Sequence, residues 1–74
     1  SLLTLGPGAS IGYHVHEKET ELFYFASGSG LADDNGEVLR VSAGDSMTTF
    51  SGQGHSVKND GAEDLVILAC IVLD

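Results

Sequence analysis

Short runs of alternating apolar and polar residues, divided by glycine-rich turns, extend along most of the chain. Alternation with a period of two is typical of strands that bury one face, and no window keeps the helical period of about 3.6 residues. The pattern predicts strands at Ala9–His16, Glu21–Ser27, Gly30–Asp33, Glu37–Val41, Ser46–Phe50, His55–Asn59 and Leu65–Leu73. Many short strands at nearly even spacing indicate an all-β fold, either a closed barrel or a sandwich.

Two dipeptides are typical of tight turns between paired strands. Asn35-Gly36 is the stronger signal, because both central residues of a type I′ turn need positive φ. Asp60-Gly61 is the second. We therefore expect a β-hairpin at each of these two positions.

The last expected strand is apolar on both of its faces. One face holds Leu65, Ile67, Ala69, Ile71 and Leu73. The opposite face holds Val66, Leu68, Cys70 and Val72. Because both faces must be shielded from water, one is expected to line the interior of a barrel. The other needs a second sheet, a further segment or another subunit, and we expect a homodimer.

The chain is short for a protein that folds around a core of its own. Its 74 residues predict a single domain, residues 1–74, that buries only about 60–65% of its unfolded surface. A bound metal or a partner subunit would therefore help to stabilise it. The sequence begins at Ser1 rather than at a methionine, so we expect that a segment upstream, including some N-terminal strand, is missing.

The charge of the chain excludes two classes of partner. Eleven acidic and three basic residues give a formal net charge of −8. Such a surface repels nucleic acid and anionic membranes. Because Lys18, Arg40 and Lys58 stand singly in the sequence, no basic patch is expected. We therefore expect neither a nucleic-acid partner nor a membrane partner.

The single cysteine, Cys70, bears on the setting of the protein. It cannot form an internal disulfide, which favours a reducing, cytoplasmic localisation. It lies in the apolar run LVILACIVLD, and we expect it to be a small buried hydrophobe. The longest apolar run, Leu65–Leu73, is too short to cross a bilayer and the sequence holds no signal peptide, so a soluble protein is expected.

Two histidines one residue apart, His14 and His16, are the first candidates for chemistry. Strand alternation places both of them on one face of the first expected strand, together with Gly12. The opposite face is then expected to hold Ile11, Tyr13 and Val15. Imidazoles at this spacing project in parallel, which suits two neighbouring positions around one metal ion.

A carboxylate and a third imidazole complete the candidate site. Glu21 shares a strand face with Phe23 and Phe25, and a carboxylate among phenylalanines is costly unless a cation neutralises it. His55 follows a glycine-rich turn and begins another expected strand. Three imidazoles and a carboxylate are ordinary ligands for one divalent transition metal ion, which could be zinc, iron, manganese, nickel or copper.

Two motifs in the chain resemble those of the cupin superfamily. The first family motif is a glycine, five residues, His-X-His, three or four residues, a glutamate, six residues and a glycine. The residues that match it are Gly8, His14, His16, Glu21 and Gly28. The second is a glycine, five residues, Pro-X-Gly, two residues, a histidine, three residues and an asparagine. The residues that match it are Gly44, Gly52, His55 and Asn59. Phe50 stands in place of the proline, which removes a fixed φ from this turn.

The chain resembles in particular the small single-domain bacterial cupins, and the short stretch between Gly28 and Gly44 fits that class. The resemblance implies a jelly-roll β-barrel, also described as a double-stranded β-helix, that is commonly dimeric. It also implies that the metal ligands are His14, His16, Glu21 and His55.

An apolar interior beside the candidate metal site is expected to form the substrate pocket. The side chains expected to line it are Phe23, Phe25, Phe50, Gln53 and Val57. We interpret Glu17 and Glu19 as solvated charges at the rim, although Glu19 could swing over the mouth. No residue is assigned as a catalytic acid or base.

Three functions remain open for such a site. The first is a metal-dependent enzyme for a small oxygenated compound, carboxylate or sugar-like, such as an isomerase, a decarboxylase or a dioxygenase. The second is a binding module in which the metal anchors a small-molecule ligand without turnover. The third is a structural role, in which metal binding stabilises the fold of a small barrel. A sugar phosphate is disfavoured, because the three cations are not placed to bind its phosphate.

Overall fold

The computed structural model describes residues 1–73, which form an all-β chain. Its strands are β1 (Leu2–Leu5), β2 (Ser10–Val15), β3 (Glu19–Ser27), β4 (Ser29–Asp34), β5 (Glu37–Ser42), β6 (Ser46–Thr49), β7 (Gly54–Lys58) and β8 (Leu65–Leu73). The all-β prediction is confirmed, and the ends of the expected strands differ from the observed ones by two residues at most. Within residues 1–73 there is no helix with the length and apolar character that spanning a membrane requires.

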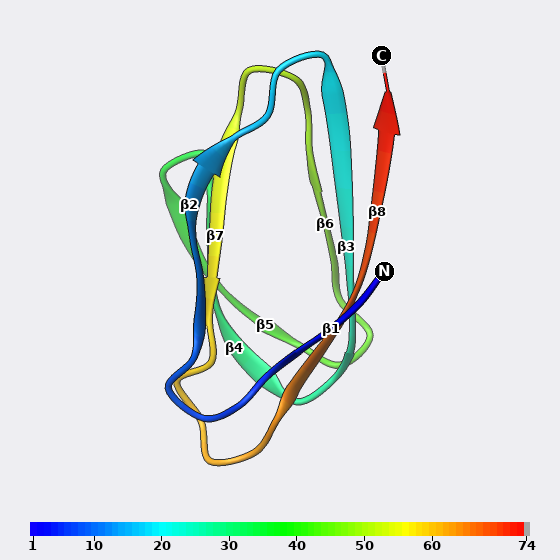
Figure 1. Cartoon of the computed structure of the whole chain (residues 1–74). Helices are drawn as coiled ribbons and strands as arrows, with labels where there is room; N and C mark the ends of the chain where they lie inside the picture. The colour runs from blue at the N-terminus through cyan, green and yellow to red at the C-terminus, as the bar shows by residue number, and fades with distance from the viewer. Residues whose placement is uncertain (74) are drawn as a thin grey trace.

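The strands form two antiparallel sheets that face each other across the core (Figure 1). One sheet has the strand order β1-β8-β3-β6, and the other has the order β2-β7-β4-β5. Most neighbours within a sheet are distant in sequence, as β3 beside β8 and β2 beside β7 illustrate. Segments from the two halves of the chain therefore alternate in each layer, which is the arrangement of the expected jelly-roll barrel.

Inward-facing side chains of both sheets form the hydrophobic core. The buried apolar residues are Phe23, Phe25, Ala32, Val41, Met47, Val57, Leu65, Ile67 and Ala69. Full burial of a large apolar side chain stabilises the fold by about 1.5–3 kcal/mol, so the two phenylalanines of β3 contribute strongly. The core fills the barrel up to Phe23, whose ring contacts the candidate site.

β1 is the strand that the sequence pattern does not predict. Leu3 and Leu5 pack against the core, and Leu2 lies on the outer side of the sheet. β1 pairs with β8, where Leu5 lies opposite Leu65 and Leu2 opposite Leu68. The segment LLTL is too short to give a periodic signal, so its extended conformation is decided by pairing with a strand from the other end of the chain.

One of the two expected hairpins is present. Asn35 and Gly36 join β4 to β5 with φ of 52° and 93°, as a type I′ turn requires. The hairpin expected at Asp60-Gly61 is wrong, because β7 and β8 belong to different sheets. The loop between them crosses from one layer to the other instead of reversing within one.

Two residues of the sequence motifs hold this crossing loop in place. The buried side chain of Asn59 donates to the carbonyl oxygens of Leu5 at 2.8 Å and of Glu63 at 2.7 Å. Gly28 passes beside the loop with φ of 84°, and a Cβ there would overlap the backbone of Asp64. These motif residues therefore act on the fold rather than on the candidate site.

β8 is apolar on both faces, as its sequence indicates. On the inner face Leu65, Ile67 and Ala69 are buried, so this face lines the interior over the first half of the strand. Ile71 continues the same face but is 49% exposed, because it lies beside the open end of the barrel. The inner face therefore lines the core at one end of β8 and the mouth at the other.

The opposite side of the β1-β8-β3-β6 sheet carries exposed apolar side chains. We name the following residues the outer apolar face: Leu2, Leu22, Tyr24, Leu68, Cys70 and Val72. The expectation that Cys70 is buried is wrong for this chain, because strand alternation turns its side chain outward while Ala69 faces the core. The outer apolar face has no cover from any of residues 1–73.

Candidate metal centre

A β-bulge in β2 determines where His14 points. Ile11 lies opposite Val57 and His14 lies opposite His55, so β2 has one more residue than β7 between the two pairs. Ile11 and His14 consequently share the inner side, and Ile11 packs against the core. The expected placement of Ile11 on the face away from the histidines is therefore wrong, because simple alternation does not continue through a bulge.

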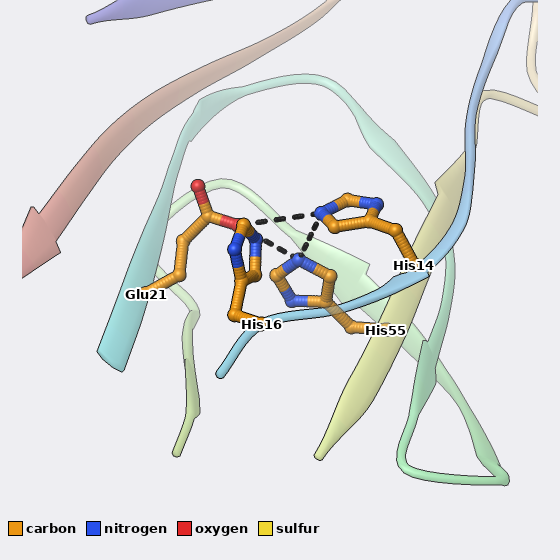
Figure 2. A group of neighbouring side chains, drawn as sticks. All are labelled: His14, His16, Glu21 and His55. Carbon is orange, nitrogen blue, oxygen red and sulfur yellow. Dashed lines mark hydrogen bonds and ion pairs between the residues drawn. The ribbon is translucent and has the colours of Figure 1, made fainter. Parts of the chain in front are cut away.

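Four side chains from three segments of the chain meet inside the barrel (Figure 2). His14 lies near the end of β2 and His16 just after it, Glu21 lies on β3, and His55 lies on β7. Their candidate ligand atoms, one from each residue, all lie within 4.8 Å of one another. The fold thus brings together the four residues that the sequence singled out, and the group could hold a metal ion.

The carboxylate of Glu21 is the centre of this group. Its Oε1 atom is 2.7 Å from Nε2 of His55, 2.9 Å from Nε2 of His16 and 3.7 Å from Nε2 of His14. The Nε2 atoms of His14 and His55 are 2.9 Å apart. All three imidazoles therefore direct the same ring nitrogen toward one carboxylate oxygen.

The outward ring nitrogens of two imidazoles have fixed oxygen partners. Nδ1 of His14 lies 2.8 Å from the carbonyl oxygen of Gly12, within the bulge. Because a carbonyl can only accept, His14 carries a proton on Nδ1, and its neutral form presents a free lone pair on Nε2. Nδ1 of His55 lies 2.8 Å from Oγ1 of the buried Thr49. Neither partner is predicted from the sequence. The only local sign that Thr49 faces inward is its position two residues after the apolar Met47.

His55 and Glu21 are the buried members of the group, with exposed fractions of 0% and 7%. The ring of Phe23 stacks on the imidazole of His55, with ring centroids 4.8 Å apart and planes inclined by 15°. Burial lowers the pKa of His55, because desolvation disfavours the charged imidazolium, while the carboxylate of Glu21 opposes this shift. The environment of His55 therefore favours the neutral imidazole that a metal ligand needs.

The donor set fits a divalent transition metal. Two ligand atoms in neighbouring positions, each about 2.1 Å from one ion, are separated by about 3 Å. The closest pairs of donor atoms here are 2.7 and 2.9 Å apart. Imidazole nitrogen and carboxylate oxygen suit zinc, iron, manganese, nickel and copper alike, so the donors do not by themselves select one metal.

Hydrogen bonds connect the turn before β7 to the turn after β2. The backbone N–H of Gly52 donates to the carbonyl oxygen of His16 at 2.7 Å. The backbone N–H of Lys18 donates to the hydroxyl of Ser51 at 2.8 Å. Lys18 has a φ of 60°, a left-handed conformation that few non-glycine residues adopt. These contacts hold the segments that carry His16 and His55 at a fixed separation.

Phe50, which stands where the family motif has proline, uses the backbone N–H that proline lacks. This N–H donates to Oε1 of Gln53 at 3.2 Å, and the backbone N–H of Gln53 donates to the carbonyl oxygen of Phe50 at 3.1 Å. A proline could not make the first of these bonds. The turn is therefore closed by a side chain instead of by a fixed φ.

The expected pocket residues fall into two groups. Phe23, Phe25 and Val57 are buried in the core, where Phe23 contacts His55. Phe50 and Gln53 lie on the turn at the mouth, and Phe50 is 58% exposed. A cavity of about 340 Å³ is lined by residues of β2, β4, β5 and β7, among them Val57 but none of the four candidate ligands.

Sequence comparison matches the profile of the Cupin domain family to residues 1–71. An oxalate-binding protein of Thermotoga maritima is 45% identical over 71 residues, which are 96% of this chain and 59% of that protein. The tetracenomycin polyketide synthase protein TcmJ of Streptomyces glaucescens is 30% identical over 59 residues, which are 80% of this chain and 40% of that protein. The chain thus spans less than two thirds of either relative.

Solved structures agree with this match. A crystal structure of a Thermotoga maritima protein described as a predicted oxalate decarboxylase superposes with a TM-score of 0.97 and 44% identity, over 99% of this chain and 64% of that one. The cupin domain of Schizosaccharomyces pombe Cnp3 superposes with a TM-score of 0.93 over 99% of this chain and 53% of that one. At 18% identity, this second likeness concerns the fold alone.

Proposed function

The chain belongs to the cupin family, and from this membership we propose that it binds one divalent transition metal and uses the metal to hold a small carboxylate compound. The proposed ligands are His14, His16, Glu21 and His55. The 45% identical relative from Thermotoga maritima is an oxalate-binding protein, which supports this class of ligand. An ion with four protein ligands keeps positions for carboxylate oxygens if its coordination is octahedral.

The convergence of the four donor atoms is the observation that carries the proposal. A carboxylate that is only 7% exposed is unfavourable without a positive partner. The ion pairs recorded for Glu21 within residues 1–73 are with His14, His16 and His55, and burial favours the neutral form of His55. A divalent cation would balance the carboxylate and satisfy the three inward nitrogens at once.

The chain's own residues define how a ligand would reach the site. Phe23 and the core close the interior on one side of the imidazoles. On the other side Ile71, which lies opposite Glu21 on β8, is half exposed. We place the entrance over Ile71 and the turn that carries Phe50 and Gln53. A bound metal would supply the positive charge that anchors or polarises an oxygen atom of the ligand.

Decarboxylation of such a ligand is a second candidate function. The position of the Glu19 carboxylate beside His16 favours it. A decarboxylase needs a group that moves a proton beside the metal. The side chain of Glu19 is 33% exposed, and its Oε1 lies 3.8 Å from Nδ1 of His16. Isomerisation of a sugar phosphate has less support, because Arg40 is engaged by Asp60 at 2.7 Å.

We also propose that the protein is a homodimer formed through the outer apolar face. The outward residues of β1, β8, β3 and β6 are uncharged throughout the described chain. In a chain with a net charge of −8, an uncharged surface is where two copies can approach with the least repulsion. Apolar residues at its centre match the composition of dimer interfaces.

Metal analysis followed by calorimetry tests the proposed function. Protein purified without added metal is analysed for its metal content, stripped with EDTA, reloaded with Mn²⁺ or Zn²⁺, and titrated with oxalate, malonate or glucose 6-phosphate. We expect one metal per chain and binding of a dicarboxylate only after reloading. Glu17→Gln, which removes an exposed carboxylate at the rim, serves as the control for Glu21→Gln.

Each outcome of that experiment decides between the hypotheses. Absence of stoichiometric metal uptake would refute the proposal. Metal uptake without binding of any dicarboxylate would indicate a structural metal. Release of carbon dioxide from the bound ligand would establish decarboxylation, and loss of this release in Glu19→Gln with unchanged ligand affinity would assign the proton transfer to Glu19.

A further inference from the structure

We propose that Thr49 is a positioning residue of the metal centre, which fixes the ring of His55 so that Nε2 points to the metal. The inference deepens the metal-binding function proposed above and rests on it. Thr49 lies on β6 directly opposite Glu21 of β3, and its exposed fraction is 0%. Its Oγ1 atom is 2.8 Å from Nδ1 of His55. Thr49 thus touches the ring nitrogen that faces away from the candidate ligand atoms.

The protonation pattern of a metal-binding imidazole explains why this contact matters. A neutral histidine that binds metal through Nε2 carries its proton on Nδ1, and a buried N–H needs an acceptor. His55 is fully buried, so bulk water cannot provide that acceptor. With a metal bound, a proton on Nδ1 of His55 would donate to the Thr49 hydroxyl oxygen 2.8 Å away. The Nε2 lone pair would then be available to the metal, on the side where Oε1 of Glu21 lies 2.7 Å away.

The neighbouring imidazole meets the same requirement by other means. His14 directs Nδ1 to the backbone carbonyl of Gly12, an acceptor that side-chain substitution does not remove. His55 instead depends on a side chain, and the ring of Phe23 stacked on it limits how the imidazole can turn. Because the Nε2 atoms of His14 and His55 are only 2.9 Å apart, a small rotation of either ring would disturb the donor geometry.

Three substitutions on β6 test the role of the hydroxyl. Thr49→Val removes the acceptor and keeps the branched shape, whereas Thr49→Ser keeps the hydroxyl. Thr48→Val makes the same chemical change at the exposed neighbour, so it is the matched control. Zn²⁺ affinity is measured by competition with a chromophoric chelator, and the protonated nitrogen of each histidine is identified in the Zn²⁺-loaded protein by long-range ¹H–¹⁵N NMR.

We expect Thr49→Val to bind Zn²⁺ about 10- to 100-fold more weakly than the parent, as for other partners of metal-bound histidines. Thr49→Ser and Thr48→Val should retain the parent affinity, and the spectra of the parent should place the His55 proton on Nδ1. Equal Zn²⁺ affinity of Thr49→Val and the parent overturns the inference and leaves the proposed function standing. A parent protein that binds no Zn²⁺ overturns the proposed function itself.

A folding defect in Thr49→Val does not remove the test. In that case the Thr49→Ser variant and the spectra of the parent decide. A proton on Nε2 of His55 in the Zn²⁺-loaded parent, or a Thr49→Ser variant that binds Zn²⁺ as weakly as a ligand variant such as Glu21→Gln, overturns the inference. A proton on Nδ1 together with full affinity of Thr49→Ser supports it.

Discussion

Replacing Glu21 by glutamine tests whether the buried carboxylate is the anionic ligand of the centre. Glu21→Gln keeps the size of the side chain and removes its charge. In the metal-free protein the amide oxygen can still accept a hydrogen bond from His16 or His55, which now approach Oε1 at 2.9 and 2.7 Å. We therefore expect the free energy of unfolding without metal to fall by about 1 kcal/mol, the net value of one hydrogen bond.

The effect on the metal-loaded protein should be much larger. A metal present at about 100 times its dissociation constant stabilises the folded parent by about 2.7 kcal/mol. In a domain of this size each kcal/mol shifts the melting temperature by about 4–8 °C, so metal should raise it by about 10–20 °C. Removing one partner from a buried charge pair costs about 3–5 kcal/mol, which corresponds to at least a 100-fold loss of metal affinity. The remaining stabilisation is then about 0.4 kcal/mol, or about 2–3 °C.

Thermal unfolding followed by circular dichroism, with EDTA and with Zn²⁺ at one fixed concentration, measures these shifts. Glu17→Gln makes the same chemical change at an exposed position on the turn after β2 and should keep the full metal-induced shift. An equal metal-induced shift in Glu21→Gln and the parent would refute the reasoning, because the carboxylate would then contribute nothing to metal binding.

Three further predictions concern the fold and the assembly. Gly28→Ala should lower the free energy of unfolding in urea by more than about 3 kcal/mol, because the new Cβ overlaps the backbone of the crossing loop. Gly36 has a similar φ but open space around it, so Gly36→Ala should lower the free energy of unfolding by only about 1–2 kcal/mol, the cost of a left-handed conformation with a Cβ. An equal decrease in the free energy of unfolding for both variants would contradict this account. Leu68→Glu on the outer apolar face should convert the dimer to a monomer, as measured by light scattering. Val38→Glu, at an exposed position on the other sheet, should leave the dimer intact. If both variants remain dimeric, the interface lies elsewhere. Cys70 should react with an alkylating reagent more slowly in the dimer than in the Leu68→Glu monomer, and equal rates would count against burial of this face.

Much of the candidate site could be read from the sequence because its residues form dense local patterns. His14 and His16 stand two positions apart, Glu21 follows on the next strand, and His55 follows a glycine-rich turn. Such spacings are set by strand geometry and turn length, so they indicate metal ligands even before the strands are placed in a sheet. The four residues are found within reach of one metal ion.

The partners that hold these residues could not be read in the same way. Thr49 is an ordinary strand residue until β6 pairs with β3 and places it opposite Glu21. The carbonyl of Gly12 becomes a partner of His14 through a bulge that depends on the register between β2 and β7. Hydrogen bonds of this kind join residues whose sequence separation or backbone shape carries no local signal.

The sequence by itself determined the strand-rich fold, the turn at Asn35-Gly36 and the residues able to bind a metal, because alternation, turn chemistry and ligand type are local properties. Only the tertiary structure decided that β1 joins β8, that the loop at Asp60-Gly61 crosses between sheets, and that Ile11 faces inward with His14. These features depend on pairing between distant strands, and the free energy of that pairing comes from contacts made only when the two sheets close around the core.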